Sequence, residues 1–181
     1  MSIKKQKEIL LMLGDSIVAW GDWSELLPEY TVINRGCAGE TVEELAGRIF
    51  QELAHQEHCD LILIMSGTNN LLMGDVLFPA IFSTMLPRLR QLVPNAKLFL
   101  NGLLPMPAAP GQDIGRVNGE LASICMQAHC QFIDADADFA THCRPITHPC
   151  FQPDGVHLTR RGYTVWAEVL ARHLAPHFDE G

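Results

Sequence analysis

Short apolar runs alternate along the chain with longer stretches in which apolar positions recur at helical spacing. The runs are rich in Leu, Ile and Val, a composition typical of parallel strands that are buried on both faces. Strands are predicted at residues 8–13, 31–34, 61–65, 97–100 and 131–134. Alternation of strands and helices predicts an α/β fold, a three-layer α/β/α sandwich with a five-stranded, mainly parallel sheet. We expect residues 1–181 to form a single domain.

Local signals define the segments between the strands. Thr41 and Glu44 have the spacing of a capping box, which predicts a helix running toward Leu53. Pro87 is expected to kink or restart the next helix. Further features are helices over 79–92, 117–128 and 159–174, and a loop over the proline-rich segment 102–111.

Charge narrows the choice of partners. The 181-residue chain has 21 acidic and 13 basic side chains, a net charge of −8, and no basic cluster longer than two residues. We therefore expect a small-molecule substrate and neither nucleic acid nor a membrane as partner. No stretch approaches the roughly 18 apolar residues of a membrane helix, so we expect a soluble, cytoplasmic protein, with a homodimer as one possible state.

The six cysteines are scattered through a chain in which we recognise no secretion signal, and this favours reduced thiols. Four potential metal ligands gather in one short segment: His142, Cys143, His148 and Cys150. Their spacing is not that of a standard zinc site, so we expect no metal there.

Two motifs carry candidate chemistry. Ser16 follows the first strand, where ligands of such sheets collect, although a serine there can also be a simple helix cap. Asp154 precedes His157 by three residues, so a single turn can bring its carboxylate to one imidazole nitrogen. The other nitrogen is then free to accept a serine proton. Taken alone, however, this second motif is more often an exposed turn with a solvated histidine.

Two further strand-end loops offer hydrogen-bond donors for an oxyanion. The loop from Asn34 to Gly39 contains glycines that permit close backbone approach, and the loop at Gly67 carries side-chain amides. Taken singly, both loops are ordinary connections between a strand and a helix.

Taken together, the motifs resemble the four sequence blocks of the SGNH (GDSL) hydrolases, and the resemblance spans nearly the whole chain. The matching segments are Gly14-Asp-Ser-Ile17, Asn34-x-Gly36, Gly67-Thr-Asn69 and Asp154-x-x-His157. Within that superfamily the chain looks most similar to the group containing the catalytic subunits of platelet-activating-factor acetylhydrolase. The resemblance implies a flavodoxin-like fold and cofactor-free hydrolysis of acyl esters by a Ser16-His157-Asp154 triad. It also implies an oxyanion hole formed by the N–H groups of Ser16 and Gly36 and the side-chain amide of Asn69. Many members have Asp where this chain has Asn70, and we assign that position to loop support.

Substrate selectivity is less constrained by the sequence. Leu71, Leu104 and Phe151 lie beside the predicted catalytic loops and are candidates for an acyl pocket, although core packing explains them equally well. Short acyl esters are the expected substrates, with acyl-thioesters or acetylated sugars as alternatives on the same fold. A non-catalytic flavodoxin-like binding module is a further alternative, which the lack of a glycine-rich phosphate motif disfavours.

Overall fold

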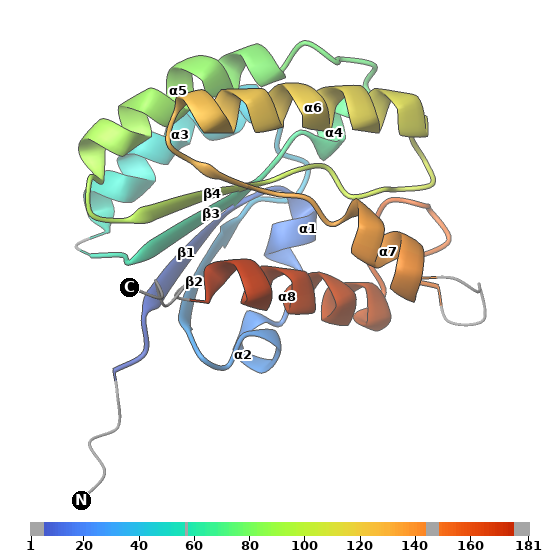
Figure 1. The fold of residues 1–181 in the computed structure, drawn as a ribbon, viewed down its shortest axis with the longest axis horizontal. Helices are drawn as coiled ribbons and strands as arrows, with labels where there is room; N and C mark the ends of the chain where they lie inside the picture. The colour runs from blue at the N-terminus through green and yellow to red at the C-terminus, as the bar shows by residue number, and fades with distance from the viewer. Residues whose placement is uncertain (1–5, 57, 144–148, 176–181) are drawn as a thin grey trace, which may run out of the picture.

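A computed structural model describes residues 6–56, 58–143 and 149–175. Its five strands form one sheet in the order β2-β1-β3-β4-β5, and every neighbouring pair is parallel (Figure 1). The predicted sheet is confirmed, and each strand end lies within two residues of its expected position. The strands are β1 (Ile9–Gly14), β2 (Thr31–Gly36), β3 (Leu61–Met65), β4 (Lys97–Asn101) and β5 (Gln131–Ile133).

The helices cover both faces of this sheet (Figure 1). One face carries α3, α5 and α6, and the other carries α1, α2, α7 and α8. The helices of the described residues are α1 (Ser16–Ala19), α2 (Trp23–Leu26), α3 (Val42–His55), α4 (Thr68–Leu72), α5 (Pro79–Leu92), α6 (Gly111–Gln127), α7 (Asp136–His142) and α8 (Arg160–Leu174).

Side chains of the strands alternate between two hydrophobic cores. Leu11 and Leu13 of β1 pack with α3 and α5 on one face, whereas Leu10 and Met12 pack with α8 on the other. Both sets are at most 1% exposed. The sheet is thus buried from both sides, which explains why its strands are continuous apolar runs and not alternating ones.

Several helix boundaries differ from the sequence prediction. The capping box at Thr41 is confirmed, since its side chain accepts from the Glu44 N–H while the Glu44 carboxylate accepts from the Thr41 N–H. Helix α5 runs through Pro87 without restarting. Helix α6 begins at Gly111, six residues early, because Pro110 is tolerated immediately before a first turn whose N–H groups need no partner within the helix.

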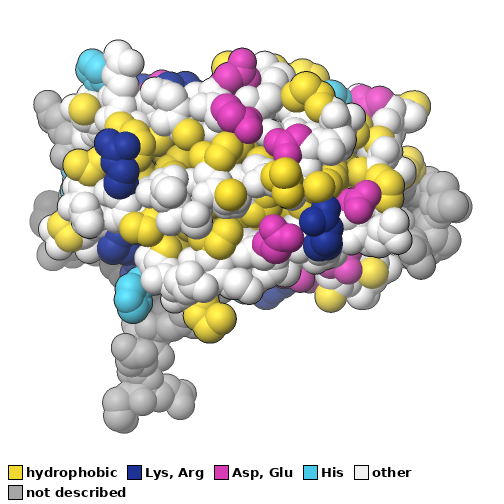
Figure 2. Space-filling view, turned by 90° about the horizontal axis from the view of Figure 1, so that it is seen from above, with side chains coloured by type: hydrophobic (Ala, Val, Ile, Leu, Met, Phe, Trp, Pro, Cys, Tyr) yellow, Lys and Arg dark blue, Asp and Glu magenta, His cyan; other side chains and the backbone are white. Residues whose placement is uncertain are grey.

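The outer face of the α5–α6 layer is largely uncharged. Figure 2 shows hydrophobic side chains in a band across this face, with charged groups scattered among them. A hollow of about 770 Å³ between the two helices contributes to the band, and its apolar lining includes Leu77, Pro79 and Ile124. Among the described residues, no helix is long and apolar enough to cross a bilayer.

Chain direction locates the functional edge of the sheet. From β1 the chain passes along one face to β2, and it then returns across the other face to β3 on the opposite side of β1. Such a reversal opens a crevice at the carboxyl ends of β1 and β3, and this strand order is that of flavodoxin-like sheets. The loops carrying Ser16 and Asn69 start at these two strand ends.

Candidate active site

Ser16 is the first residue of α1 and follows β1 through a tight turn. Gly14 has φ +155° there, and a Cβ atom at this position would collide with the carbonyl oxygen of Met65. Asp15 caps the helix, because its carboxylate accepts from the N–H of Ile17 at 3.0 Å. The local sequence thus directs the Ser16 N–H and hydroxyl to the carboxyl edge of the sheet.

The Asp154–His157 turn forms as the spacing predicted. One carboxylate oxygen of Asp154 accepts from the N–H groups of Val156 and His157, at 2.9 and 3.0 Å. The other lies 2.7 Å from His157 Nδ1. The hydrogen bond to His157, followed by those from the two backbone N–H groups, lowers the pKa of Asp154 to about 2. The carboxylate is therefore ionised at any neutral or mildly acidic pH.

Tertiary packing brings this turn to Ser16 across 141 residues of sequence. His157 Nε2 lies 3.1 Å from Ser16 Oγ, which completes a continuous Ser16-His157-Asp154 chain of polar contacts. Helix α8, which follows the catalytic turn, is tied to α1, which carries Ser16. The buried hydroxyl of Tyr163 in α8 donates to the carbonyl of Ile17 in α1 at 2.9 Å.

Gly36 does not have the position expected of an oxyanion donor. Its N–H donates to Asn34 Oδ1 at 2.9 Å, and the Asn34 amide in turn donates to the carbonyls of Val18 and Ala19. A Cβ at residue 36 would collide with the backbone of Ala19. Glycine is thus required here for the close approach of α1 to β2, and the prediction of Gly36 as a donor is corrected.

Gly39, three residues further on, has the features that Gly36 lacks. It is exposed with φ +81°, and among the described residues no acceptor faces its N–H. The next residue, Glu40, accepts at its carbonyl from the Asn69 side-chain amide at 2.9 Å. Asn69 and the turn at Gly39 are therefore held together, and one amide proton of Asn69 remains for another acceptor.

Polar contacts fix these two loops. The buried Glu40 carboxylate is bound by the Arg48 guanidinium, with Nη2 2.8 Å from Oε2. Asn70, which is 3% exposed, accepts from the N–H of Val42 and donates to Glu43 and Asp75. The predicted supporting role of Asn70 is confirmed, since its side chain ties the start of α3 to the turn after α4.

The sequence profile of the GDSL-like lipase/acylhydrolase family matches residues 12–165. The chain belongs to this family. It is also 27% identical over 172 residues to the human platelet-activating factor acetylhydrolase IB subunit alpha2. The aligned region covers 90% of this chain and 74% of the human subunit. The protein is accordingly a carboxylic ester hydrolase, and a non-catalytic flavodoxin-like module is not supported.

Solved structures share the fold of this GDSL-family hydrolase. A putative platelet activating factor protein from Streptococcus pneumoniae superimposes with a TM-score of 0.79 at 20% identity, covering 95% of this chain and 86% of that one. A variant acetyl xylan esterase from Geobacillus stearothermophilus gives a TM-score of 0.72 at 20% identity, with 93% and 94% coverage. At these identities, the likeness establishes the three-layer architecture.

The predicted acyl-pocket residues of the hydrolase belong to its interior. Leu71 and Leu104 are 6% and 3% exposed and pack in the two cores. Phe151 is partly buried, packs near the ring of Phe139 and forms an isolated bridge with Leu158. Leu71 and Leu104 stabilise the fold, so their predicted substrate-binding role is corrected in favour of core packing, while that of Phe151 stays a prediction.

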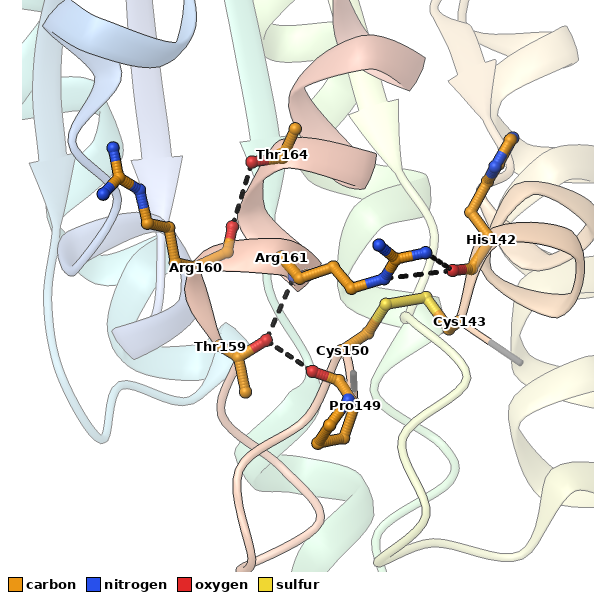
Figure 3. Close-up of a disulfide and its surroundings, with 9 residues drawn as sticks. His142, Cys143, Pro149, Cys150, Thr159, Arg160, Arg161 and Thr164 are labelled. Carbon is orange, nitrogen blue, oxygen red and sulfur yellow. Dashed lines mark hydrogen bonds between the residues drawn. A yellow bond between two sulfur atoms is a disulfide. The ribbon is translucent and has the colours of Figure 1, made fainter. Parts of the chain in front are cut away.

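A disulfide overturns one part of the cysteine prediction. Cys143, at the end of α7, is bonded to Cys150, which begins the segment leading to the Asp154 turn (Figure 3). Figure 3 also shows Thr159 donating to the carbonyl of Pro149, and Arg161 donating to the carbonyl of His142. The other four cysteines are free thiols: Cys37, Cys59, Cys125 and Cys130.

The disulfide also changes the candidate metal segment. It removes the sulfurs of Cys143 and Cys150 as thiolate ligands, while His148 lies outside the described residues. Helix α7 ends at His142, where the segment begins. The pairing could not be predicted from the spacing of the cysteines, because disulfide connectivity depends on tertiary proximity.

Asp15 titrates unusually because it is buried beside the candidate nucleophile. Burial raises the pKa of Asp15 from 3.8 to about 6. The hydrogen bond from the N–H of Ile17 has the opposite, smaller effect on this pKa. Between about pH 4 and 6 the unfolded chain therefore loses this proton before the native state does. As pH rises, Asp15 progressively destabilises the native state, by on the order of 3 kcal/mol once both states are ionised.

We expect Asp15→Asn to gain stability relative to the wild type as pH rises from 4 to 7, because asparagine does not ionise. The measurement is the free energy of unfolding from urea titrations at pH 4, 5, 6 and 7. The change with pH is the test, since a constant offset also includes the altered cap on Ile17. A difference that stays flat across this range would show that Asp15 is not titrating as described.

Proposed function

We propose that the protein is a serine esterase that cleaves short-acyl carboxylic esters with Ser16 as nucleophile, His157 as general base and Asp154 as the orienting acid. The observation that carries the proposal is the continuous contact from Ser16 Oγ through the imidazole to Asp154, at 3.1 and 2.7 Å. A helix-capping serine needs neither partner, so this arrangement supports nucleophilic catalysis.

The chemistry proceeds in two halves. As Ser16 Oγ attacks the ester carbonyl carbon, His157 Nε2 takes the hydroxyl proton, and Asp154 stabilises the resulting imidazolium at Nδ1. The tetrahedral intermediate collapses when His157 returns the proton to the departing alcohol, which leaves an acyl group on Ser16. A water deprotonated by the same nitrogen then releases the carboxylic acid and restores the serine.

The oxyanion would be held by three donors on three loops. Ser16 supplies its backbone N–H at the first turn of α1, Asn69 supplies the remaining proton of its side-chain amide, and Gly39 supplies its backbone N–H in place of Gly36. The contact between Asn69 and the Glu40 carbonyl supports this set, because it joins two donors into one rigid unit.

Asn69→Ala should lower kcat by on the order of 10²–10³, because an oxyanion donor acts on the transition state more than on the bound substrate. KM should change far less. The measurement is steady-state hydrolysis of p-nitrophenyl acetate, with thermal unfolding checked because the Glu40 contact is also lost. Asn118→Ala, on α6 and bonded to Leu103, is a matched control for loss of a buried amide. Equal losses of kcat in both variants would argue against an oxyanion role.

A panel of p-nitrophenyl esters from acetyl to palmitoyl, run beside acetyl-CoA, tests the substrate class. We expect kcat/KM to be highest for acetyl to butyryl esters, since two of the predicted apolar pocket residues, Leu71 and Leu104, are committed to the core. A higher kcat/KM for palmitoyl than for acetyl esters would contradict the short-acyl assignment, and a preference for acetyl-CoA would change the class to thioesters.

A further inference from the structure

We infer that a hollow beside Trp20 is the subsite for the departing alcohol, and that its chemistry fits a sugar, so that the substrates are acetylated carbohydrates. This inference rests on the proposed esterase function. The hollow has a volume of about 340 Å³, within the range of small-molecule sites, and lies between the α1–α2 segment and the start of α8.

Trp20 connects this hollow to the catalytic residues. It lies four residues after Ser16, so both side chains occupy the same face of α1, and its N–H donates to the Ser16 carbonyl at 3.1 Å. Its ring stacks on His157 with centroids 4.2 Å apart and planes 29° from parallel. The departing alcohol takes its proton from His157 and therefore emerges beside the imidazole that Trp20 covers.

More than half of the indole remains open to a ligand. Trp20 is 54% exposed, whereas Trp23 and Trp166 are 3% and 0% exposed. Because Trp20 lines the hollow as well as contacting His157, a group bound there would cover indole surface that now faces water. A large aromatic surface of this kind contributes binding free energy when a ligand removes it from solvent.

The polar rim of the hollow selects the chemical class. Asp22, Glu25, Arg160 and Thr164 line it around the indole, and Arg160 Nη2 lies 2.6 Å from a Glu25 carboxylate oxygen. A sugar ring packs its C–H face on an aromatic platform while its hydroxyls hydrogen-bond to ionised side chains, which are strong partners. A phosphate is disfavoured as well, because the carboxylates of Asp22 and Glu25 outnumber the single guanidinium of Arg160 and repel an anion.

The test keeps the acetyl group constant and changes only the alcohol. Methyl acetate, a monoacetate of methyl xyloside and acetylcholine are compared for the wild type, Trp20→Ala and Trp20→Phe, with Met126→Ala as an exposed control on α6. We expect Trp20→Ala to lower kcat/KM for the sugar acetate by about 10-fold, chiefly through KM, since a stacking contact of about 1.4 kcal/mol corresponds to that factor. Loss of the contact between Trp20 and His157 affects all the esters alike, so the sign of a subsite is that the sugar acetate loses more kcat/KM than methyl acetate, and Trp20→Phe should keep most of the sugar preference.

Two outcomes of this comparison would overturn the inference. An equal loss on all three esters would make Trp20 a positioning residue for His157 and not part of a subsite. A wild-type preference for acetylcholine would assign the hollow to a quaternary ammonium group, held by the indole and the carboxylates.

A binding measurement separates this inference from the esterase proposal. In Ser16→Ala, tryptophan fluorescence is followed while unacetylated methyl xyloside is added. We expect a saturable change that is absent from the Ser16→Ala/Trp20→Phe double variant, because the other two tryptophans are buried. Such a change in Ser16→Ala, together with a wild-type protein that hydrolyses no ester, would support the sugar subsite while refuting the esterase proposal. Esterase activity without any fluorescence response would refute the sugar subsite alone.

Discussion

Replacing Ser16 with alanine is expected to lower kcat for p-nitrophenyl acetate by about 10⁶, the scale found when a catalytic serine is removed from a well-studied hydrolase. The hydroxyl is the attacking group, and its recorded partner is His157 at 3.1 Å. Stability should change little, because alanine is favourable in a helix and leaves the Asp15 cap intact. The measurement is kcat from steady-state kinetics, with the midpoint of thermal unfolding recorded in parallel.

Ser123→Ala is the matched control for this variant. Ser123 is an exposed helical serine on α6 whose hydroxyl donates to the Gly119 carbonyl, and it should retain wild-type activity. If Ser16→Ala kept activity within 10-fold of the wild type, the nucleophile would have to be another group, and the proposed mechanism would fail.

Asp154→Asn is expected to lower kcat by up to about 10⁴. The asparagine oxygen can still accept the N–H groups of Val156 and His157, so the turn should persist. What is lost is the anionic acceptor at His157 Nδ1, 2.7 Å away, which fixes the tautomer and stabilises the imidazolium. The variant therefore separates the catalytic role of the carboxylate from its local structural role.

The pH dependence sharpens this prediction. The pKa of Asp154 is lowered to about 2, chiefly by its hydrogen bond to His157, so the wild-type carboxylate is ionised throughout an assay from pH 5 to 9. The defect of Asp154→Asn should therefore extend across that whole range. It is measured as kcat/KM against pH for both proteins. Wild-type activity in the variant would reduce the catalytic set to a Ser16-His157 dyad.

The sequence predicted most of the sheet and the catalytic turn because both depend on short-range patterns. Parallel strands buried on both faces are continuous apolar runs, and an Asp three residues before a His can close a turn without help from the remainder of the chain. The capping box at Thr41 was predictable for the same reason. The supporting role of Asn70 was instead predicted from the resemblance to the SGNH hydrolases, because its contact with Val42 is long-range.

Features that depend on three-dimensional proximity were missed or misassigned. Gly36 matched the expected motif, yet its N–H belongs to Asn34 because α1 packs closely against β2. Leu71 and Leu104 are adjacent to catalytic loops in sequence but point into the cores. Nothing in the spacing of Cys143 and Cys150 identified their bond.

Trp20 illustrates a signal that was present but not used. Its spacing of four residues from Ser16 puts both on one face of any helix that starts at the serine. The stacking on His157, however, depends on where α8 delivers the catalytic turn, and that is a property of the whole fold.

The most direct test of the central claim is covalent labelling with a fluorophosphonate, followed by mass spectrometry of the digested protein. A serine activated by His157 attacks the phosphorus and expels fluoride, whereas an ordinary helix-capping serine does not react. We expect a single adduct on the peptide containing Ser16, with labelling that parallels loss of esterase activity and is abolished in His157→Ala. An unlabelled Ser16 in protein that still hydrolyses esters, or inactivation through an adduct on another residue, would contradict the account.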